Sequence, residues 1–334
     1  MASDSNLQIH DVVMIGAGPA ALSAAIYTTR EDIDTVLYER GVVGGLAAVT
    51  DLIDNYPGFP KGVTGLDLSD DLRNHAERFG ADIRLGEVLS INDEGQYKKL
   101  ETTDGDMLAK AVLIATGSDY KKLGVPGEQE YYARGVHYCA TCDGAFYRDK
   151  RLVVVGGGNS AAQEALFLTK FATHIDMLVR SDHMRASDIL QQEVLKHKSI
   201  TVHYNTTTDK IVGQDNHVTK VIGTDTTTNK EVDFVTDGVF VFIGLKPNTD
   251  FLKSSDIALN EIGMVKSNDD LETNVPGVYV AGDVRELATM QIASAVGEGA
   301  KAALKMREYL DDWNRKYKKT EAKPSKQRST ANVS

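Results

Sequence analysis

The chain is poor in cysteine and has no long apolar run. Only two of its 334 residues are cysteine, too few for the disulfide framework of a secreted domain. No apolar run reaches the roughly 18 to 20 residues that a membrane-spanning helix needs. The first residues, MASDSNLQIHD, lack the basic and apolar regions of a signal peptide. We therefore expect a cytoplasmic protein without a membrane segment, in which a cysteine pair is catalytic or metal-binding rather than structural.

Positive charge is also in short supply. The 37 Lys and Arg against 48 Asp and Glu leave a formal net charge of −11. Because nucleic-acid binding depends on neutralising phosphates with Lys and Arg, this balance argues against nucleic acid as the main partner. The hydrophobic and charged fractions, 42% and 25%, are those of an ordinary globular protein. The length favours two domains, each large enough to bury a core.

Two segments repeat one pattern of strand, glycine turn and helix. In the first, an apolar run over residues 11–15 leads into G-A-G-P-A-A at 16–21 and a helical run. In the second, a run over 151–155 leads into G-G-G-N-S-A at 156–161 and a helix over 162–171. Such a turn lets backbone N–H groups approach a pyrophosphate at the start of a helix. One copy fits tight strand-to-helix packing equally well, but two copies predict an α/β fold with two Rossmann-like dinucleotide-binding domains.

The residues after each following strand indicate which nucleotide is bound. Glu39 ends the apolar run that starts at Thr35, and its carboxylate can accept hydrogen bonds from an unphosphorylated ribose, as in FAD or NAD. The strand expected over 174–179 is followed by Arg180 and Arg185 instead of an acid. A guanidinium there can bind a 2′-phosphate, so the second site favours NADP. The alternative is that Arg180 is a solvated surface charge.

Three further apolar runs suggest how the domains are connected. Buried strands are expected over 111–117 and 238–244, each after one of the glycine turns. A third run, over 277–283, has no glycine turn of its own and would complete the first domain if the chain returned to it. The second domain would then be an insertion. A helix is expected over 292–310, and the polar, basic residues 313–334 predict a disordered tail.

The two cysteines form the motif C-A-T-C-D-G over residues 139–144. A disulfide between Cys139 and Cys142 closes a small ring, so it stabilises the fold little and serves better as a reversible redox couple. A zinc site would need two more ligands, and His137 supplies only one. A pair of inert buried thiols stays open as an alternative. Asp143 is placed to move a proton as a thiolate attacks or leaves, or else to cap the next helix or turn.

Taken together, these motifs resemble the low-molecular-weight thioredoxin reductases up to about residue 310. The shared segments are G-A-G-P-A, C-A-T-C-D-G, G-G-G-N-S-A and P-G-V-Y-V-A-G-D-V, with N-Y-P-G at 55–58, A-T-G at 115–117 and a later Gln291. The resemblance implies a homodimer that passes electrons from NADPH through FAD to the cysteine pair and on to thioredoxin or a thioredoxin-like protein. It also implies that the inserted domain rotates, because the flavin cannot meet the nicotinamide and the cysteines at once.

The resemblance also assigns individual residues. Cys142 would face the flavin, Cys139 would attack the substrate disulfide and Asp143 would supply the proton. We expect FAD to be bound by Gly16, Gly18, Pro19, Ala20, Glu39, Gly45, Asn55, Ala115, Thr116, Gly117, Asp283, Gln291 and Ile292. We expect NADPH to be bound by Gly156, Gly158, Asn159, Ser160, Ala161, Arg180 and Arg185. The expected domains are 1–118 with 246–312 for FAD and 119–245 for NAD(P)H, followed by the tail 313–334.

Three positions depart from the family pattern. Ser181 stands where a second arginine is usual, Leu46 where a glutamine is usual, and Met290 where an arginine is usual. NADH or ferredoxin as the electron donor therefore stays an alternative to NADPH. Two other readings are a dithiol oxidase of the same fold and a non-catalytic redox-sensing or binding module that uses FAD as a structural prop.

Overall fold

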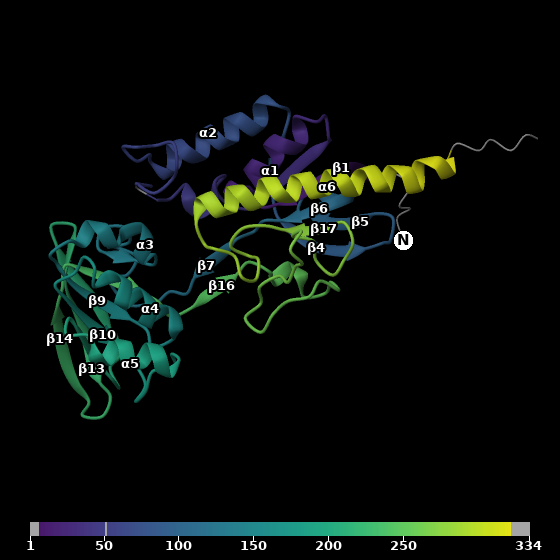
Figure 1. Ribbon diagram of the computed structural model, residues 1–334. Coiled ribbons are helices and arrows are strands. Elements are labelled where there is room, and N and C mark those ends of the chain that lie inside the picture. Colours follow the sequence, from purple (N-terminus) through teal and green to yellow (C-terminus); the bar gives the residue numbers. More distant parts are fainter. Residues whose placement is uncertain (1–6, 51, 322–334) are drawn as a thin grey trace, which may run out of the picture. The chain divides into compact units, whose positions relative to one another are not determined.

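The computed structural model describes residues 7–50 and 52–321 and shows an α/β chain of two compact units (Figure 1). Within the described residues, unit 1 contains the chain up to 49, residues 64–117, and the chain from 247 onward. Unit 2 contains residues 50–63 and 118–246. The chain leaves unit 1 after Gly117 and returns at Pro247, so the second unit is an insertion. The predicted fold class, two Rossmann-like units with one inserted in the other, is confirmed.

The sheet of unit 1 is built on parallel strands. In the order β3-β2-β1-β6, each strand is parallel to its neighbour, and β17 pairs with β6 in the same direction. The antiparallel strands β5 and β4 extend the sheet beyond β6. The run over 277–283 therefore does serve the first unit. The strands are β1 (Gln8–Ile15), β2 (Thr35–Glu39), β3 (Asp82–Leu85), β4 (Val88–Asp93), β5 (Lys98–Thr102), β6 (Gly105–Ile114) and β17 (Val278–Val280).

Helices α1 (Pro19–Thr29) and α6 (Ile292–Glu321) lie side by side in unit 1, and α2 (Gly65–Arg78) packs against α1 (Figure 1). A side chain on Gly299 of α6 would stand 2.0 Å from the carbonyl oxygen of Ala20, so the glycine permits the close approach. Val12, Met14 and the small residues of α1 form the core beneath these helices. Two short 3-10 turns, Gly45–Ala47 and Asp250–Leu252, also belong to this unit.

Helix α6 does not end where the sequence predicts. The predicted disordered tail begins at Trp313, but α6 continues to Glu321, so the prediction is wrong for residues 313–321. Trp313 is buried: its indole donates to the carbonyl oxygen of Gln96 at 2.8 Å and contacts the ring of Tyr97 at 5.5 Å. The ammonium of Lys110 lies 4.8 Å from the centre of the indole ring. The rest of the predicted tail, 322–334, lies outside the described residues.

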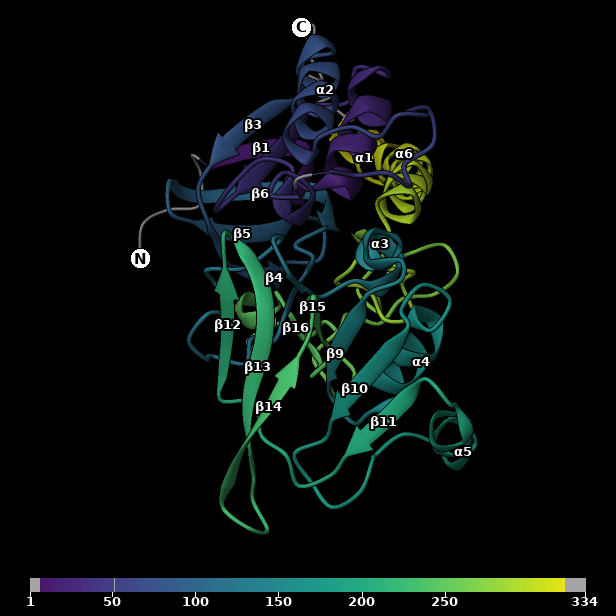
Figure 2. The same ribbon diagram turned by 90° about the vertical axis from the view of Figure 1, so that its left-hand side faces the viewer.

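Unit 2 has a parallel sheet of its own, in the order β11-β10-β9-β15-β8, and a separate antiparallel sheet β12-β13-β14 (Figure 2). The parallel strands are β8 (Val136–His137), β9 (Arg151–Val155), β10 (His174–Leu178), β11 (Ile200–His203) and β15 (Gly238–Val241). The antiparallel strands are β12 (Lys210–Gln214), β13 (His217–Asp225) and β14 (Lys230–Val235). The helices and helical turns are α3 (Ala140–Asp143), a 3-10 turn (Gly144–Tyr147), α4 (Asn159–Leu168) and α5 (Asp188–Lys196).

The chain enters and leaves the main segment of unit 2, residues 118–246, at a pair of short strands. Strand β7 (Ser118–Tyr120) follows Gly117, and it pairs with β16 (Leu245–Pro247), which follows Gly244. The predicted boundaries, 118/119 and 245/246, fall within one residue of these crossings. Residues 50–63, which the sequence places in the first domain, group with unit 2.

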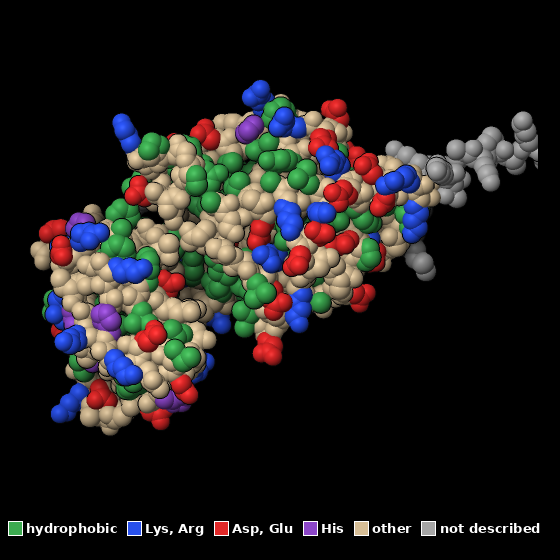
Figure 3. Space-filling model, viewed as in Figure 1, with side chains coloured by type: hydrophobic (Ala, Val, Ile, Leu, Met, Phe, Trp, Pro, Cys, Tyr) green, Lys and Arg blue, Asp and Glu red, His purple; other side chains and the backbone are tan. Residues whose placement is uncertain are grey.

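The later turns of α6 carry charges of both signs on the surface (Figure 3). An exposed face of this kind is typical of a helix in contact with water. None of the helices in the described part of the chain has both the length and the apolar character that crossing a bilayer requires.

We expect Trp313→Ala to lower the free energy of unfolding by about 3 kcal/mol, because the indole loses its buried packing and its hydrogen bond to Gln96. Urea denaturation followed by circular dichroism measures the change. The control is Arg315→Ala on the same turn, where an exposed side chain is removed and a change below about 0.5 kcal/mol is expected. Equal stability of both variants would show that the end of α6 is not anchored by Trp313.

Candidate active site

The two cysteines lie at the start of the short helix α3 and form a disulfide. Cys139 is the N-cap residue and Cys142 lies in the first turn, with 5.3 Å between their Cα atoms. The backbone N–H of Cys142 points to the sulfur of Cys139 at an N···S distance of 3.2 Å. Both residues are half-buried. The sulfur of Cys139 therefore lies next to the backbone N–H groups of the first turn of α3.

Asp143 faces a buried histidine and not the backbone. Its carboxylate oxygen Oδ2 lies 3.1 Å from Nδ1 of His137, and the side chains are 21% and 8% exposed. The alternative that Asp143 caps the following turn is wrong, because its side chain makes no capping hydrogen bond there. The other ring nitrogen of His137, Nε2, lies 2.6 Å from the hydroxyl oxygen of Tyr147.

The residue between His137 and the first cysteine anchors the segment from its other side. The hydroxyl of Tyr138 donates to Glu128 at 2.7 Å, and the same carboxylate accepts the backbone N–H groups of Leu123 and Gly124. Glu128 is buried with these donors around it. The segment that leads into the cysteines is therefore held by polar contacts on both sides.

The first glycine turn has the shape that a pyrophosphate requires. A side chain on Gly16 would stand 2.5 Å from the carbonyl oxygen of Ala115, so this glycine allows β1 to pass directly against β6. A side chain on Gly18 would meet nothing within 4 Å, and no side chain caps the start of α1 after it. The N–H groups of the first turn of α1 thus face open space, which fits a negatively charged diphosphate.

Several other predicted FAD residues gather around this helix start. Glu39 accepts the N–H of Ala17 at 2.8 Å, so its carboxylate is held beside the turn. The backbone of Gly45 lies next to Gly18, where a built Cβ would stand 3.8 Å from the Gly18 Cα. Gly282 lies beside Ala20 in the same way, which brings Asp283 close to the first turn of α1. Pro19 is the first residue of the helix.

The segment over 115–117 is fixed by the returning chain. The hydroxyl of Thr116 donates to the carbonyl oxygen of Asn248 at 2.8 Å, and the Asn248 side-chain amide donates back to the Thr116 carbonyl oxygen at 3.1 Å. Gly117 has a φ of +66°, a left-handed conformation that suits glycine. Ala115 supplies the carbonyl against which Gly16 packs.

Asp283 lies in an unusual electrostatic environment. Burial, and then the negative charge of Glu298, raise the pKa of its carboxyl group to about 6. Glu298 accepts the N–H of Gly282 at 2.8 Å and pairs with Arg285, so it holds the turn that carries Asp283. Groups with raised pKa values are common in ligand sites because they are shielded from water.

Of three further predicted FAD residues, two lie at the start of α6 and one lies in the segment 50–63. Gln291 and Ile292 lie at the start of α6, where the carbonyl oxygen of Gln291 accepts the N–H of Ala295. Ala295 approaches the Gly282 turn, so these two residues belong to the group around Asp283. Asn55 is exposed and lies in the segment 50–63, which groups with unit 2. The role of Asn55 at FAD therefore stays a prediction.

The second glycine turn repeats the geometry of the first in unit 2. A side chain on Gly156 would stand 2.3 Å from the carbonyl oxygen of Phe242, and Gly156 has a φ of +144°. A side chain on Gly158 would meet nothing within 4 Å, and α4 starts without a side-chain cap. Asn159 and Ser160 are exposed in the first turn, and Ala161 is buried beneath it. This turn also fits a pyrophosphate.

The two predicted arginines lie in the loop that folds over the second turn. The backbone N–H of Arg185 donates to the carbonyl oxygen of Gly157 at 2.6 Å, which fixes the loop after β10 against the glycines. Asn159 accepts the N–H of Ser187 at 2.8 Å and closes the loop further on. The side chains of Arg180 and Arg185 are exposed and form no ion pair within the described chain, so their positive charge is available to a phosphate.

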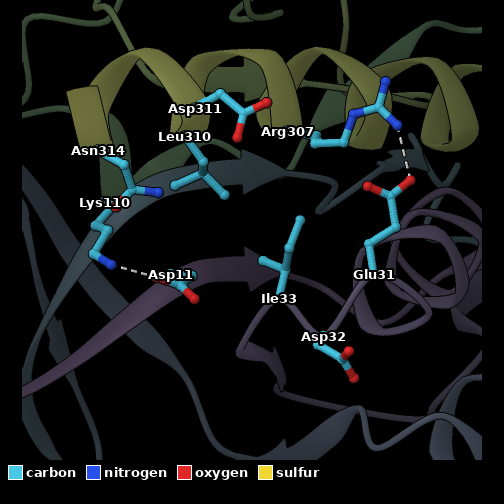
Figure 4. A pocket seen from close by; sticks show the side chains of 9 residues that line it. All are labelled: Asp11, Glu31, Asp32, Ile33, Lys110, Arg307, Leu310, Asp311 and Asn314. Carbon is cyan, nitrogen blue, oxygen red and sulfur yellow. Dashed lines mark hydrogen bonds and ion pairs between the residues drawn. The ribbon is translucent and has the colours of Figure 1, made fainter.

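A hollow of about 410 Å³ in unit 1 lies away from all these residues. It lies between the start of β1 and the face of α6, and Figure 4 shows its two cations paired with acids, Lys110 with Asp11 and Arg307 with Glu31. None of the predicted site residues lines it. Because ligands of such sheets bind at the carboxyl ends of the strands, we do not assign this hollow to a cofactor.

Comparison with known proteins agrees with this geometry. Residues 10–299 match the family described as pyridine nucleotide-disulphide oxidoreductase. The chain belongs to this family. It is 42% identical over 308 residues to a thioredoxin reductase of Bacillus subtilis (strain 168), a match that covers 92% of this chain and 97% of that protein. The resemblance to thioredoxin reductases seen in the motifs is thereby confirmed.

Solved structures give the same result. The crystal structure of thioredoxin reductase from Streptococcus pyogenes MGAS5005 matches with a TM-score of 0.87 and 38% identity, covering 92% of this chain and all of that one (100%). The thioredoxin reductase from Giardia duodenalis matches with a TM-score of 0.87 and 33% identity, covering 91% and 99%. The fold that carries the site is therefore that of these enzymes.

Sequence reasoning missed some residues that the structure places at the site. His137 was considered only as an incomplete zinc ligand, and its contact with Asp143 was not foreseen, although two side chains six positions apart flank the cysteines. Asn248, Arg285 and Glu298 were missed because each meets its partner through the tertiary fold. No local spacing marks such contacts.

We expect Gly156→Ala and Gly158→Ala to have opposite consequences. Gly156→Ala should lower the melting temperature of the cofactor-free protein, because its Cβ would collide with the Phe242 carbonyl in a left-handed backbone. Gly158→Ala should leave the melting temperature nearly unchanged but weaken nicotinamide dinucleotide binding by roughly tenfold or more, because its Cβ points into the space for the pyrophosphate.

Differential scanning fluorimetry and equilibrium dialysis measure the two effects. Wild-type dinucleotide affinity in Gly158→Ala would contradict the placement of the pyrophosphate at α4. The matched pair in the first turn, Gly16→Ala and Gly18→Ala, serves as a control for stability, since it repeats the same two steric situations.

Proposed function

We propose that this protein is a thioredoxin reductase that passes electrons from NADPH through FAD to the Cys139–Cys142 disulfide and then to thioredoxin or a thioredoxin-like protein. The observation that carries the proposal is the disulfide at the start of α3, within a chain that holds two open glycine turns for dinucleotides. The relatives named thioredoxin reductase, at 42% identity over nearly their whole length, support the same reaction.

Unit 1 is proposed to bind FAD and unit 2 to bind NADPH. In unit 1 the diphosphate would lie at the start of α1, with Glu39 at the ribose, Asp283 at the ribityl or phosphate region of FAD and Gln291 near the flavin ring. FAD supplies two-electron transfer between nicotinamide and disulfide. Asn55 stays a proposed contact that unit 1 alone does not account for. The residues proposed to hold FAD are those given above: Gly16, Gly18, Pro19, Ala20, Glu39, Gly45, Asn55, Ala115, Thr116, Gly117, Asp283, Gln291 and Ile292.

The chemistry at the cysteines is thiol–disulfide exchange. With both cysteines reduced, the Cys139 sulfur attacks one sulfur of the partner disulfide, the partner's S–S bond breaks, and a mixed disulfide forms. The Cys142 sulfur then attacks Cys139, which releases the partner's second sulfur. Two electrons and two protons pass from the enzyme to the partner, and Asp143 is proposed to carry the protons between sulfurs.

The choice of NADPH rests on Arg180 and Arg185, with Gly156, Gly158, Asn159, Ser160 and Ala161 holding the rest of the dinucleotide. Two unpaired guanidinium groups in the loop over the second turn suit a 2′-phosphate, and no acid in this loop is placed to accept a 2′-hydroxyl. Asp182, the acid nearest in the chain, is engaged by His183 at 2.6 Å. Ser181 removes one positive charge from the family pattern, so this pocket has fewer donors.

We also propose that the enzyme works in the cytoplasm as a homodimer. The acidic chain, with its net charge of −11, makes nucleic acid a poor partner. The rotation of unit 2 that the family mechanism needs would occur where β7 and β16 connect the units, since the chain enters the main segment of unit 2, residues 118–246, at β7 and leaves it at β16. Both crossings follow a glycine with positive φ.

The proposal is tested by turnover and by trapping. Purified holoenzyme should be yellow and should reduce thioredoxin disulfide in the presence of NADPH. Cys142→Ser should accumulate a mixed disulfide between Cys139 and thioredoxin, visible by mass spectrometry, because the resolving sulfur is absent. Cys139→Ser should give no such adduct through Cys142. A colourless protein without turnover, or an adduct formed only through Cys142, would contradict the proposal or its division of labour.

The electron donor is tested separately by stopped-flow reduction of the flavin. We expect NADPH to be faster than NADH at low concentration, and Arg180→Ala to weaken NADPH binding by about tenfold, the loss of one charge-assisted hydrogen bond. NADH kinetics should not change. Lys196→Ala, an exposed cation on α5 of the same unit, is the matched control. Equal rates with both nucleotides in the wild type would show that the arginines do not select a phosphate.

A further inference from the structure

We propose that His137 is a positioning residue of the active site. It is held by a hydrogen bond with Tyr147, it holds Asp143 through a close ion-pair contact, and it shares the protons that move during thiol–disulfide exchange. This inference rests on the proposed function, since it assigns a partner to the residue proposed to carry those protons. The three side chains belong to one unit and come from three consecutive elements, β8, α3 and the 3-10 turn that follows.

The packing around His137 leaves little freedom for the ring. His137 is 7% exposed, and its imidazole stacks on Phe240 of β15 at a centroid distance of 5.2 Å. Tyr147 meets both rings edge-on, at 5.2 Å from His137 and 5.6 Å from Phe240. Gly238 makes room for Tyr147, since a Cβ there would stand 2.4 Å from the phenol ring. The imidazole is therefore held with one nitrogen toward Asp143 and the other toward Tyr147.

The two contacts determine which nitrogen carries the proton in the neutral ring. An ionised carboxylate carries no proton, so at the 3.1 Å contact between Nδ1 and Oδ2 of Asp143 the proton of the neutral ring belongs on Nδ1. Nε2 then has no proton and accepts from the hydroxyl of Tyr147. Burial raises the pKa of the Tyr147 hydroxyl, and the charges of Asp143 and Asp237 raise it further, so the phenol keeps its proton. The chain of donors thus runs from Tyr147 through His137 to Asp143.

This arrangement can accept one more proton without moving a heavy atom. If a proton arrives at the pair, the imidazole becomes an imidazolium that donates from both nitrogens, to Asp143 and to the Tyr147 oxygen, while the phenol proton turns away. A carboxylate alone would have to hold that proton by itself in half-buried surroundings. The third group that orients a base has the same role in other nucleophilic sites.

In the proposed exchange, each proton is accounted for. As the Cys139 sulfur attacks and the partner's S–S bond breaks, the Cys139 proton passes to the Asp143–His137 pair and from there to the departing partner sulfur. As the Cys142 sulfur resolves the mixed disulfide, its proton follows the same route to the second partner sulfur. Net transfer is two electrons and two protons, and no further oxidant or reductant enters.

The charged groups around the imidazole are few. The imidazole of His137 contacts Asp143 of α3, Tyr147 of the 3-10 turn and the uncharged ring of Phe240 of β15. Asp237, which precedes β15, acts on Tyr147 and is itself close to Lys150 at 3.5 Å. Asp143 is therefore the charged group in direct contact with the imidazole.

The test measures one dithiol transfer in the holoenzyme. The enzyme is reduced with dithionite, freed of excess reagent, and mixed with thioredoxin disulfide or with a small aromatic disulfide over pH 5.5 to 9. Acid quench and thiol alkylation give the rate constant. His137→Phe should slow the transfer by about tenfold, with unchanged KM for thioredoxin.

Three further variants separate positioning from packing. His137→Asn keeps a donor near the Nδ1 position and should recover most of the rate, while Tyr147→Phe removes only a hydroxyl and should slow transfer by a few-fold. His203→Asn is the matched control. His203 lies on β11, at the edge of the sheet opposite β8, and its ring nitrogen lies 2.9 Å from a carboxylate oxygen of Asp176. This variant should leave the rate unchanged.

The outcomes are distinct. Wild-type rates in the His137 and Tyr147 variants would overturn the inference. So would equal losses of rate in His137→Phe and His137→Asn, since that pattern indicates packing alone. If the wild type reduces the small disulfide but not thioredoxin, the proposed function fails while the role of His137 is still decided by the small disulfide.

Discussion

In both units of this protein, a backbone carbonyl occupies the place where a side chain of the glycine turn would have to stand. At Gly16 the obstacle is the Ala115 carbonyl, and at Gly156 it is the Phe242 carbonyl. Only glycine lets the strand pass so close to its neighbour and turn at once into a helix. Because of this turn, the next glycine and the uncapped start of α1 or α4 face open space, where the helix dipole favours a diphosphate.

The redox centre also lies at the start of a helix, where backbone N–H groups are free of partners within the helix. Helix α3 has a single turn, and its N-cap is the Cys139 sulfur itself, which accepts the N–H of Cys142. The segment before it is fixed on one side by Tyr138 and Glu128 and on the other by His137 and Asp143. These contacts hold the segment that carries the cysteines on both sides of the disulfide.

Much of the architecture could be predicted because it depends on residues that are close together in the sequence. The strand over 151–155, the glycine turns and the acid at Glu39 follow from spacing and residue type alone. The fold class and the return of the chain for β17 followed from counting strands against glycine turns. The end of α6 could not be predicted this way, because its basic sequence is typical of a solvated tail. Its anchor is the hydrogen bond from Trp313 to Gln96, a residue that is distant in the sequence. The contact of His137 with Asp143 was missed for a similar reason, since the structure of α3 decides which way the carboxylate points.

The central claim is that the Cys139–Cys142 disulfide is a redox couple in series with the flavin, and electron counting tests it most directly. Anaerobic titration with dithionite, followed by absorption, measures how many electrons each subunit accepts without depending on the nicotinamide. The account predicts that the wild type takes up one pair of electrons more than Cys139→Ser, since the variant has a flavin but no disulfide. Equal uptake by the two proteins would contradict it.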